Sequence, residues 1–404
     1  MDQPDPAPAT TAPNPRLPAL DVVRGIAVLG ILAANIVGMG QPMSAYSWPG
    51  GFLADPGPGG DALWAAQLVF VDGKFRGLFT LLFGAGMVLF QRRALARGTG
   101  GTHLLVRRLA WLAAFGLAHW ALLWRGDILL TYALAGMIVL PLLTWPAERQ
   151  FAAGLAGYLV GTLMLATMVT MLTAVDPADV VSIAHDKQAQ GMRDAAAMAG
   201  TSYLAWVSYT LAAHADDLAV GLLLALFETV PLLLIGMTLV PAGLFDGRVA
   251  PRRQLGWGAI LWAGGTAATA AIAAMALPGG IDFAESMTAP AMAAFPALAS
   301  SLGLMAMLAL WGGRSRGPLA RRLAAAGRCA FSNYIGTSAL ALAVFSGWGL
   351  GLFGELGRLE LYGVMLVFWA FMLAWPPLWL AHFRHGPLEW AWRCLTYGCW
   401  VPLR

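Results

Sequence analysis

One histidine, His119, is the side chain of this sequence best suited to acid–base chemistry. It lies within an apolar run, about 16 Å along a helix from Arg108 near the start of that run. An imidazole gives and takes a proton near neutral pH, so His119 is a candidate general base. Arg125 and Asp127 follow in a charged turn at the far end of the run. The alternative is a core histidine bonded to a backbone carbonyl.

Further ionisable residues lie inside two other apolar runs. Asp72, Lys74 and Arg76 occur together in one run, and Glu228 lies in a later one. An ionisable side chain is costly in hydrocarbon, so each of these is expected to be paired, to face a cavity or to be functional. The structural alternatives are that Lys74 extends to the lipid headgroups and that Glu228 pairs with Arg76.

The composition places these residues in a membrane protein. Of 404 residues, 59% are hydrophobic and only 11% are charged, which is about half the charged share of a soluble protein. The mean hydropathy is +0.67 and the sequence contains 17 Trp. Apolar runs of about 20 residues are long enough to span a bilayer as helices. The sequence therefore predicts an all-α, polytopic membrane protein with the lipid bilayer as its partner.

Ten apolar runs predict ten transmembrane helices. Basic residues are retained in the cytoplasm, and 19 of the 25 fall on one side when the runs alternate with a cytoplasmic N-terminus. Both termini are therefore expected in the cytoplasm, with a long extracytoplasmic loop at 174–216 that contains a short surface helix. The predicted spans are 20–40, 62–90, 107–124, 127–145, 150–173, 217–240, 255–276, 289–312, 324–346 and 359–380.

This topology places most of the ionisable residues within the spans in the outer half of the membrane. Asn35, in the first span, lies at the same level. Because several helices contribute to this level, we expect the residues to line one cavity that is open to the extracytoplasmic side. The set is His119, Asp127, Glu228, Asn35, Asp72, Lys74, Arg76 and Arg125.

A second set of polar residues lies at the cytoplasmic side. Arg24 follows Asp21 by three residues, so a structural ion pair is one interpretation of both. Arg328, Asn333 and Tyr334 open the ninth span and either bind an anion or anchor the helix. With the neighbouring basic pair, the candidates for binding an anion at this side are Arg24, Arg107, Arg108, Arg328, Asn333 and Tyr334.

The remaining segments predict a three-part organisation. Residues 1–18 are rich in proline and are expected to be a disordered cytoplasmic tail. Residues 19–381 form the transmembrane domain, and 382–404 hold a short helix that starts at Pro387 and lies along the inner interface. The three cysteines have no spacing typical of a metal or redox site, so no metal is expected. The arginines occupy short loops, so nucleic acid is not an expected partner.

The chain resembles the YeiB-like family, also called domain of unknown function 418. The motifs that carry the resemblance span nearly all of residues 16–398. They are Leu20-Asp21 with Arg24-Gly25, Lys74-Phe75-Arg76, His119 with Gly126-Asp127, Asn333-Tyr334 and Gly386-Pro387-Leu388-Glu389-Trp390. The first motif is in turn similar to that of transmembrane acyltransferases, which pass an acyl group from a cytoplasmic donor to an acceptor on the far side. Where some of those enzymes carry a histidine, this chain has Asn35.

This resemblance implies an acyltransferase of a bacterial plasma membrane, with acyl-CoA as co-substrate and no bound cofactor. His119 is then the base, Asp127 or Glu228 orients it, and Arg76 and Asn35 stabilise developing negative charge. Cytoplasmic arginines attract the donor phosphates, and the acceptor is a small molecule or a glycan.

Two other functions fit the same residues. A transporter or exporter would bind a polar solute in the cavity and carry a proton on Glu228. A non-catalytic membrane subunit would fill the cavity with its own side chains. The sequence does not specify the donor, the acceptor or the oligomeric state.

Overall fold

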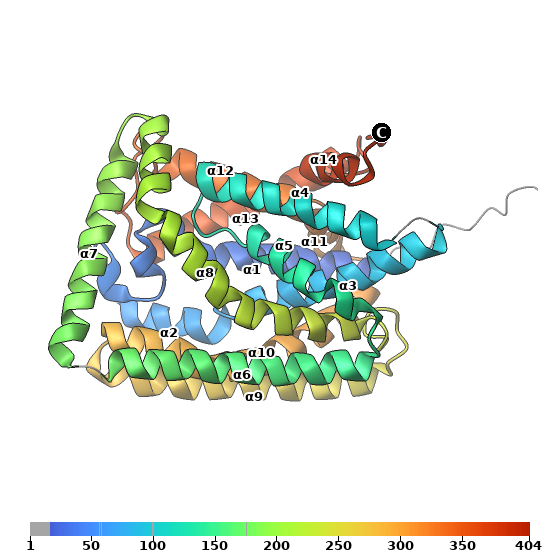
Figure 1. Cartoon of the computed structure of the whole chain (residues 1–404), viewed down its shortest axis with the longest axis horizontal. Coiled ribbons are helices and arrows are strands. Elements are labelled where there is room, and N and C mark those ends of the chain that lie inside the picture. The colour runs from blue at the N-terminus through green and yellow to red at the C-terminus, as the bar shows by residue number, and fades with distance from the viewer. Residues whose placement is uncertain (1–16, 56, 58, 99–100, 175) are drawn as a thin grey trace, which may run out of the picture.

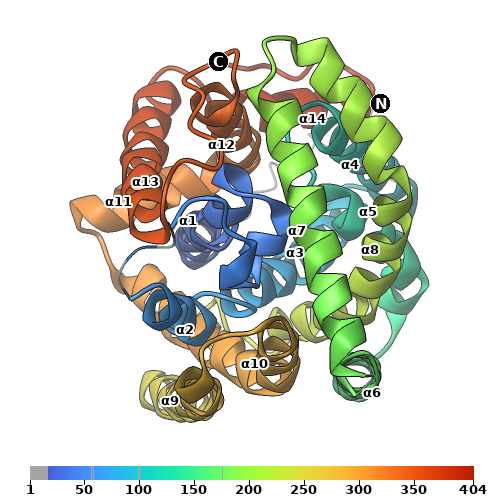
Figure 2. The ribbon, with the colours of Figure 1, turned by 90° about the vertical axis from the view of Figure 1, so that its left-hand side faces the viewer.

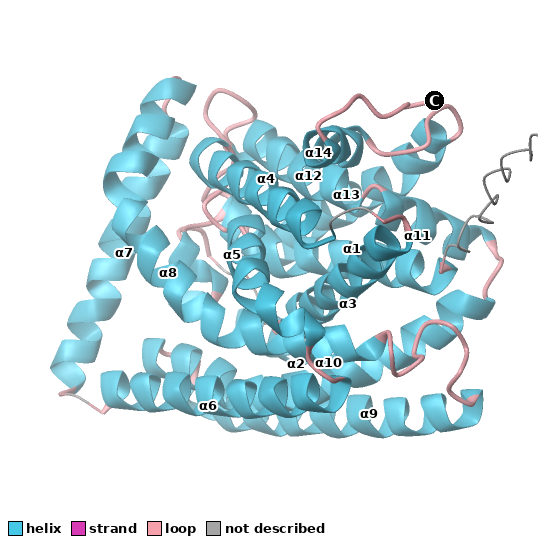
Figure 3. Ribbon diagram, turned by 45° about the vertical axis from the view of Figure 1, so that its right-hand side comes forward, coloured by secondary structure: helices cyan, strands magenta, loops and turns pink. Residues whose placement is uncertain are grey.

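The computed structural model describes residues 17–55, 57, 59–98, 101–174 and 176–404. These residues form helices joined by short loops, and they contain no strand (Figure 3). The predicted tail at 1–18 lies almost entirely outside the described residues. The helices of the N-terminal half are α1 (Pro18–Gly40), α2 (Gly60–Phe70), α3 (Lys74–Ala96), α4 (Gly101–Leu122), α5 (Leu129–Val139), α6 (Ala147–Thr173) and α7 (Pro177–Ala199). Those of the C-terminal half are α8 (Tyr203–Leu239), α9 (Pro251–Ala276), α10 (Phe283–Arg314), α11 (Pro318–Arg328), α12 (Ala330–Phe345), α13 (Arg358–Leu380) and α14 (Pro387–Tyr397).

Seven helical segments of the described chain are long and apolar enough to cross a membrane. Five of them are the single helices α1, α6, α8, α10 and α13. The other two are the segment formed by α2 and α3, and the segment Pro251–Gly279, which contains α9. The chain is therefore a helical membrane protein, as its composition predicts. The three other predicted spans are also helical, in α4, in α5 with the short turn after it, and in α11 with α12. These segments are shorter or less apolar, so the total of ten remains a prediction.

Most of the helices run along the long axis of the molecule, and α7 stands across one end of it (Figure 1). Figure 2 looks onto that end, where α7 crosses the near face of the bundle. We call it the α7 end. The arginines at the end of α3 and at the starts of α9 and α11 lie at the opposite end of the molecule. We call this the basic end. The C-terminus also lies towards the basic end (Figure 1).

The segment 174–216 is more ordered than the sequence indicates. The short surface helix expected there is α7, which has 23 residues, and α8 begins at Tyr203 instead of near residue 217. Asp176 caps α7 by accepting a hydrogen bond from the Ala178 backbone N–H at 2.9 Å. Helix α8 therefore extends beyond the predicted span, and α7, which precedes it in the chain, lies across the end of the bundle.

Two glycines allow α1 and α11 to pack closely enough to position the site. A Cβ on Gly25 of α1 would overlap the Leu323 carbonyl of α11, and one on Gly327 would overlap the Asp21 carbonyl. Such small-residue crossings are typical of membrane helices. This contact brings the start of α1, with Arg24, against the end of α11.

Candidate functional site

The main cavity of the described chain opens at the basic end. Its volume is about 470 Å³, within the range of small-molecule sites. It lies between α1 and α3 on one side and α4, α12 and α14 on the other, where two clusters of buried apolar side chains meet. Its lining includes four residues of the set predicted to bind an anion at the cytoplasmic side, namely Arg24, Arg108, Arg328 and Tyr334. The cavity expected to open to the extracytoplasmic side stays a prediction.

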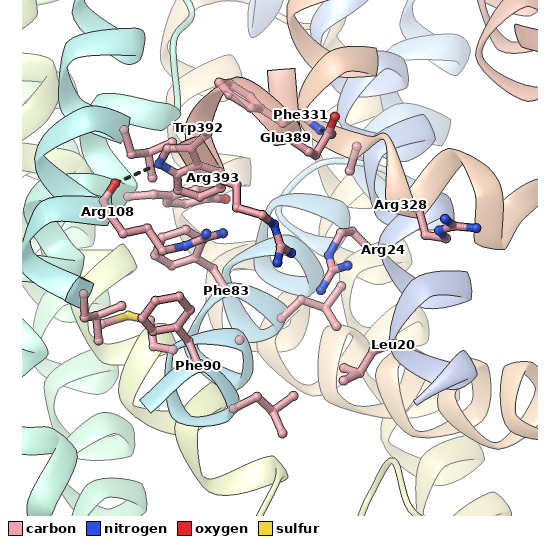
Figure 4. Close-up of a pocket in the computed structure, with 18 of the residues that line it drawn as sticks. Leu20, Arg24, Phe83, Phe90, Arg108, Arg328, Phe331, Glu389, Trp392 and Arg393 are labelled. Carbon is pink, nitrogen blue, oxygen red and sulfur yellow. Dashed lines mark hydrogen bonds between the residues drawn. The ribbon is translucent and has the colours of Figure 1, made fainter. Parts of the chain in front are cut away.

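Arginines surround the mouth of this cavity. Seven line it, against two acidic residues, Asp21 and Glu389. Figure 4 shows the guanidinium groups of Arg24, Arg108 and Arg393 turned towards the same space. This excess of positive charge favours an anionic group at this end of the cavity. The arginines are Arg24, Arg93, Arg97, Arg108, Arg328, Arg384 and Arg393.

The short C-terminal helix α14 completes the mouth. Its Trp392 donates a hydrogen bond to the Arg108 carbonyl at 2.9 Å, and the Arg108 guanidinium lies 3.5 Å from the centre of the Trp392 rings (Figure 4). This stacking fixes a cation on an aromatic surface. The helix starts at Pro387 as predicted, and it packs against α4 and α12.

Glu389, one of the two acidic residues of the mouth, caps α12. Its carboxylate accepts hydrogen bonds from the backbone N–H groups of Phe331 at 2.7 Å and Ser332 at 3.0 Å. The Ser332 hydroxyl donates a further bond of 2.6 Å. Burial raises the pKa of Glu389 above its ordinary value, while these hydrogen bonds oppose that rise. Glu389 therefore joins α14 to the start of α12.

The inner end of the cavity is aromatic. Tyr132 of α5 lies between two phenylalanines of α3, with ring centres 5.8 Å from Phe79 and 5.5 Å from Phe83. Tyr334 of α12 and Ile128 also line this end. The cavity thus changes from cationic at its mouth to apolar and aromatic inside, which suits a ligand with an anionic head and an apolar tail.

His119 lies beside this inner end, in a buried array of three side chains. Its Nδ1 is 2.9 Å from Asp127 Oδ1, and its Nε2 is 2.9 Å from Ser338 Oγ. The His119 and Asp127 side chains are 0% and 1% exposed. The backbone N–H of Leu130 donates to the other Asp127 oxygen at 2.7 Å. This order of carboxylate, imidazole and hydroxyl is the arrangement that activates a hydroxyl for nucleophilic chemistry.

Tyr334 separates the array from the cavity. Its ring centre is 5.0 Å from that of His119. Its hydroxyl accepts a hydrogen bond from the Ile128 N–H at 3.2 Å and donates one to the Gly126 carbonyl at 3.4 Å. Tyr334 therefore forms part of the cavity wall and also contacts both residues that flank Asp127.

Glu228 and Arg76 form an ion pair of their own. Arg76 Nη2 is 2.6 Å from Glu228 Oε2, as in the structural interpretation of the sequence. Glu228 therefore does not orient His119, and Arg76 does not share a cavity with it. The link from this pair to the site is indirect, through the Thr80 hydroxyl, which contacts both the Arg76 carbonyl at 2.8 Å and the Tyr132 hydroxyl at 3.0 Å.

Asp72 and Lys74 belong to a third group. Lys74 is buried and donates to the Leu68 carbonyl at 2.6 Å, so it does not extend to the headgroups. The Asp72 carboxylate accepts a hydrogen bond from the side-chain NH₂ group of Gln67 at 3.2 Å. The side-chain oxygen of Gln67 accepts one from the fully buried Arg358 at 2.9 Å. The charged residues expected to line one outer cavity thus belong to several separate bonded groups.

Arg125 pairs with a residue of α7. Its Nη2 is 2.5 Å from Asp194 Oδ2, and the other Asp194 oxygen contacts His214 at 2.9 Å and Tyr209 at 2.8 Å. Burial alone would raise the pKa of Asp194, but the His214 hydrogen bond and the Arg125 charge outweigh it and hold the pKa well below its ordinary value. A hollow of only about 30 Å³ lies beside this group.

The chain is similar to bacterial proteins along almost its whole length. It is 32% identical to the uncharacterized protein YeiB of Escherichia coli strain K12 over 391 residues, which cover 93% of this chain and 95% of the relative. The chain belongs to the YeiB-like DUF418 family. The family model, described as a protein of unknown function, matches residues 239–399. The chain is also 29% identical to the uncharacterized protein YxaH of Bacillus subtilis strain 168, over 97% of both chains. No solved structure matches it.

Motif residues that carry the resemblance to this family surround the cavity. Asp21 and Arg24 of the first motif, Tyr334 of the α12 motif and Glu389 of the terminal motif all line it. Asp127 is bonded to His119, which lies beside the inner end of the cavity. The family resemblance and the cavity therefore point to the same part of the molecule.

The other predicted site residues lie outside the cavity lining. Arg107 packs near Gly398 at the end of α14. Asn333 is buried and has a structural role, donating to the Ala326 carbonyl at 3.3 Å and accepting from the Trp375 indole at 2.7 Å. Asn35 is buried in the second half of α1. Within the described residues, no group of three His, Cys, Asp or Glu side chains can hold a metal ion.

Ser338, the third member of the array, was not predicted from the sequence. A serine in an apolar helix gives no signal by itself, because hydroxyls in such helices are usually bonded to their own backbone. The available clue was its spacing of four residues from Tyr334, which places both on one face of α12.

Proposed function

We propose that this protein is a membrane acyltransferase that takes an acyl group from a cytoplasmic donor and passes it to an extracytoplasmic hydroxyl or amine. The observation that carries the proposal is the buried array of Asp127, His119 and Ser338 beside the inner end of a cavity with a cationic mouth. A general base at such a place serves group transfer, because the donor and the base are held at fixed positions.

The cavity matches the chemistry of an acyl-CoA donor. Arg24, Arg108 and Arg328 at the mouth provide positive charge for phosphates, and Trp392 and Phe331 provide aromatic surface for an adenine ring. The apolar inner part, near Tyr132, suits the thioester end of the donor. This arrangement directs the acyl group towards His119.

His119 is the proposed base, and Asp127 is the carboxylate that orients it. The Asp127 contact to Nδ1 leaves Nε2 to accept a proton. Tyr334 is a polar group of the inner wall, and its ring centre lies 5.0 Å from that of His119. Within the described residues, the hydrogen bonds of this array involve neither Asn35 nor Arg76, so these two residues are not assigned a catalytic role.

The distribution of basic residues supports the orientation. The basic end then lies in the cytoplasm of a bacterium, at its plasma membrane, and both termini lie on that side. The α7 end faces the extracytoplasmic space, from which a small-molecule or glycan acceptor approaches the array.

The test is acyl transfer by purified protein supplied with radiolabelled acetyl-CoA and a membrane-lipid and glycan acceptor mixture. We expect His119→Ala and His119→Gln to lower transfer by a factor of about 10² to 10⁴, as is typical for the loss of a general base. His103→Gln, at an exposed position of the same helix, is the matched control. Unchanged transfer in both His119 variants would remove the histidine from the mechanism.

A transporter is the competing function, because a cavity open at one end also suits one state of an alternating-access cycle. The ion pair of Glu228 with Arg76 weighs against Glu228 as a mobile proton carrier. Uptake of a solute into proteoliposomes, together with no consumption of acetyl-CoA, would favour the transporter.

A further inference from the structure

Ser338 is the one member of the array that general-base chemistry does not require. Its side chain is buried, with a relative exposure of 1%, and its Oγ lies 2.9 Å from His119 Nε2. Resting on the proposed acyltransferase function, we propose that Ser338 Oγ is the nucleophile that carries the acyl group as an ester between the donor and the acceptor.

The hydrogen-bond directions in the array support an activated hydroxyl. Asp127 accepts at both oxygens, from His119 and from the Leu130 backbone N–H, as a carboxylate does. His119 then carries its hydrogen on Nδ1, and Nε2 has a free electron pair. The Ser338 hydroxyl is therefore the donor to Nε2, so the imidazole is placed to remove its proton.

Two other buried hydroxyls of the spanning helices bond to the backbone of their own helix. The Thr337 hydroxyl donates to the Tyr334 carbonyl at 2.9 Å, and the Ser301 hydroxyl donates to the Ala297 carbonyl at 2.7 Å. Ser338 is 3.4 Å from the corresponding carbonyl of Tyr334, which is longer than its contact with His119. Its hydroxyl is thus directed to the imidazole and away from the helix.

The place of Ser338 in α12 suits a relay. The helix starts at Ala330, where Glu389 of the cavity mouth caps it, and Ser338 is eight residues further, about 12 Å along the axis. It therefore lies deeper than the cavity mouth, on the same helix face as Tyr334 of the cavity wall. The proposal requires the acyl carbon to pass the Tyr334 ring, which lies between the cavity and the array.

The first half-reaction transfers the acyl group to the protein. His119 Nε2 accepts the Ser338 proton while Oγ forms a bond with the thioester carbonyl carbon. The carbon–sulfur bond then breaks, and the proton on Nε2 passes to the sulfur, giving free CoA thiol and an acyl ester on Ser338.

The second half-reaction passes the acyl group on. His119 Nε2 accepts a proton from the acceptor hydroxyl or amine, which forms a bond with the ester carbon. The bond from that carbon to Ser338 Oγ breaks, and the proton on Nε2 returns to Oγ. The enzyme is restored, and the two steps together need no oxidant, reductant or further reactant.

The experiment is to incubate the purified full-length protein with radiolabelled acetyl-CoA and no acceptor. We expect stoichiometric label that survives denaturation, together with release of free CoA, and a labelled peptide that contains Ser338. Ser338→Ala is expected to lower the label by a factor of about 100 or more while still binding a non-reactive thioether analogue of acetyl-CoA. Thr337→Val, which removes the neighbouring hydroxyl of the same helix, is the matched control and keeps the label.

Ser338→Cys adds a readout that a purely structural serine would not give. The ester label of the wild-type protein resists neutral hydroxylamine, whereas a thioester on the cysteine variant is cleaved by it. Acyl transfer that persists in Ser338→Ala, with no label on the wild-type protein, overturns the serine carrier and leaves the acyltransferase function standing. A wild-type protein that neither binds acetyl-CoA nor releases CoA from it overturns both.

Discussion

The carboxylate of Asp127 determines which nitrogen of His119 carries the hydrogen. It accepts from Nδ1 at 2.9 Å, and so leaves Nε2 as the acceptor that faces Ser338. Replacing one oxygen of this carboxylate with nitrogen therefore changes the hydrogen bond between the imidazole and the Ser338 hydroxyl, without altering the shape of the site.

Asp127→Asn is expected to lower acyl transfer by about 10⁴-fold, the size of the effect when the orienting carboxylate of such an array becomes an amide. The amide oxygen can still accept from Leu130, so its NH₂ group faces Nδ1 and forces the hydrogen onto Nε2. The measurement is of kcat and KM for acetyl-CoA, and we expect the loss of activity to appear in kcat. Asp216→Asn, at an exposed position of α8, should leave both constants unchanged.

Single residues show what the sequence can and cannot reveal. His119 and Asp127 were predictable because ionisable residues are rare in apolar runs, and each one draws attention. Ser338 was not, because a serine is tolerated in a membrane helix and its role depends on a partner 219 residues away. Arg76 and Glu228 were found for the same reason as His119, but only their geometry shows that they neutralise each other.

At the scale of elements, the loop between α4 and α5 joins the array to the α7 end. Arg125 faces outward to Asp194 of α7, and Asp127, two residues later, faces inward to His119. Trp124 also anchors this loop, donating to the Gly38 carbonyl of α1 at 3.1 Å. Helix α7 therefore positions the loop that holds the orienting carboxylate.

This contact gives α7 an acid-sensitive attachment. Because the pKa of Asp194 is depressed in the folded protein, the carboxylate contributes stability above its ordinary value near 4. That stability is lost as the pH falls through the depressed folded value. We expect hydrogen exchange in α7 to rise relative to α9 as the pH is lowered from 6 to below about 4.

Asp194→Asn should remove this acid dependence and give faster exchange in α7 already at pH 6, with a smaller loss of acyl transfer than Asp127→Asn. Asp186→Asn, at an exposed position of the same helix, is the control. An acid profile in Asp194→Asn identical to that of the wild-type protein would show that another group attaches α7.

The elements were predictable where they are uniformly apolar. The ten predicted runs are largely helical, because twenty apolar residues have few alternatives in a bilayer, although the run 62–90 is divided between α2 and α3. Helix α7 and the first turns of α8 were underestimated because their polar residues resemble those of a loop. Asp194, His214 and Arg125 form a bonded group only once the chain is folded.

For the whole molecule, the cavity mouth and the array define two ends of a transfer path. The mouth is assembled from the start of α1, the end of α3, α4, α11 and α14, so its charge arises from segments that are far apart in sequence. The sequence predicted that Arg24, Arg108 and Arg328 lie on one side of the membrane. It did not predict the direction of their side chains. Three of its arginines were therefore identified from the sequence, but the cavity that they surround was not.

Arg24→Gln and Arg393→Gln should each raise KM for acetyl-CoA by about 10-fold or more, since hydrogen bonds to charged groups contribute about 1.5–3 kcal/mol. The kcat should change little, because the phosphates are bound equally before and during transfer. Acetyl-pantetheine, which lacks the nucleotide phosphates, should show the same KM in all variants. Arg252→Gln, at the basic end but outside the cavity lining, is the control.

The orientation of the molecule determines which compartment supplies the donor. Cys399 is exposed near the C-terminus, and Val181 is exposed on α7. If the basic end is cytoplasmic, a membrane-impermeant maleimide should label Cys399 in a Cys394→Ser protein only after the cells are permeabilised. It should label a Val181→Cys protein, with Cys394 and Cys399 both changed to Ser, in intact cells. The opposite pattern would place the arginine-lined mouth outside the cell, where acyl-CoA is absent, and would exclude a cytoplasmic donor for this cavity.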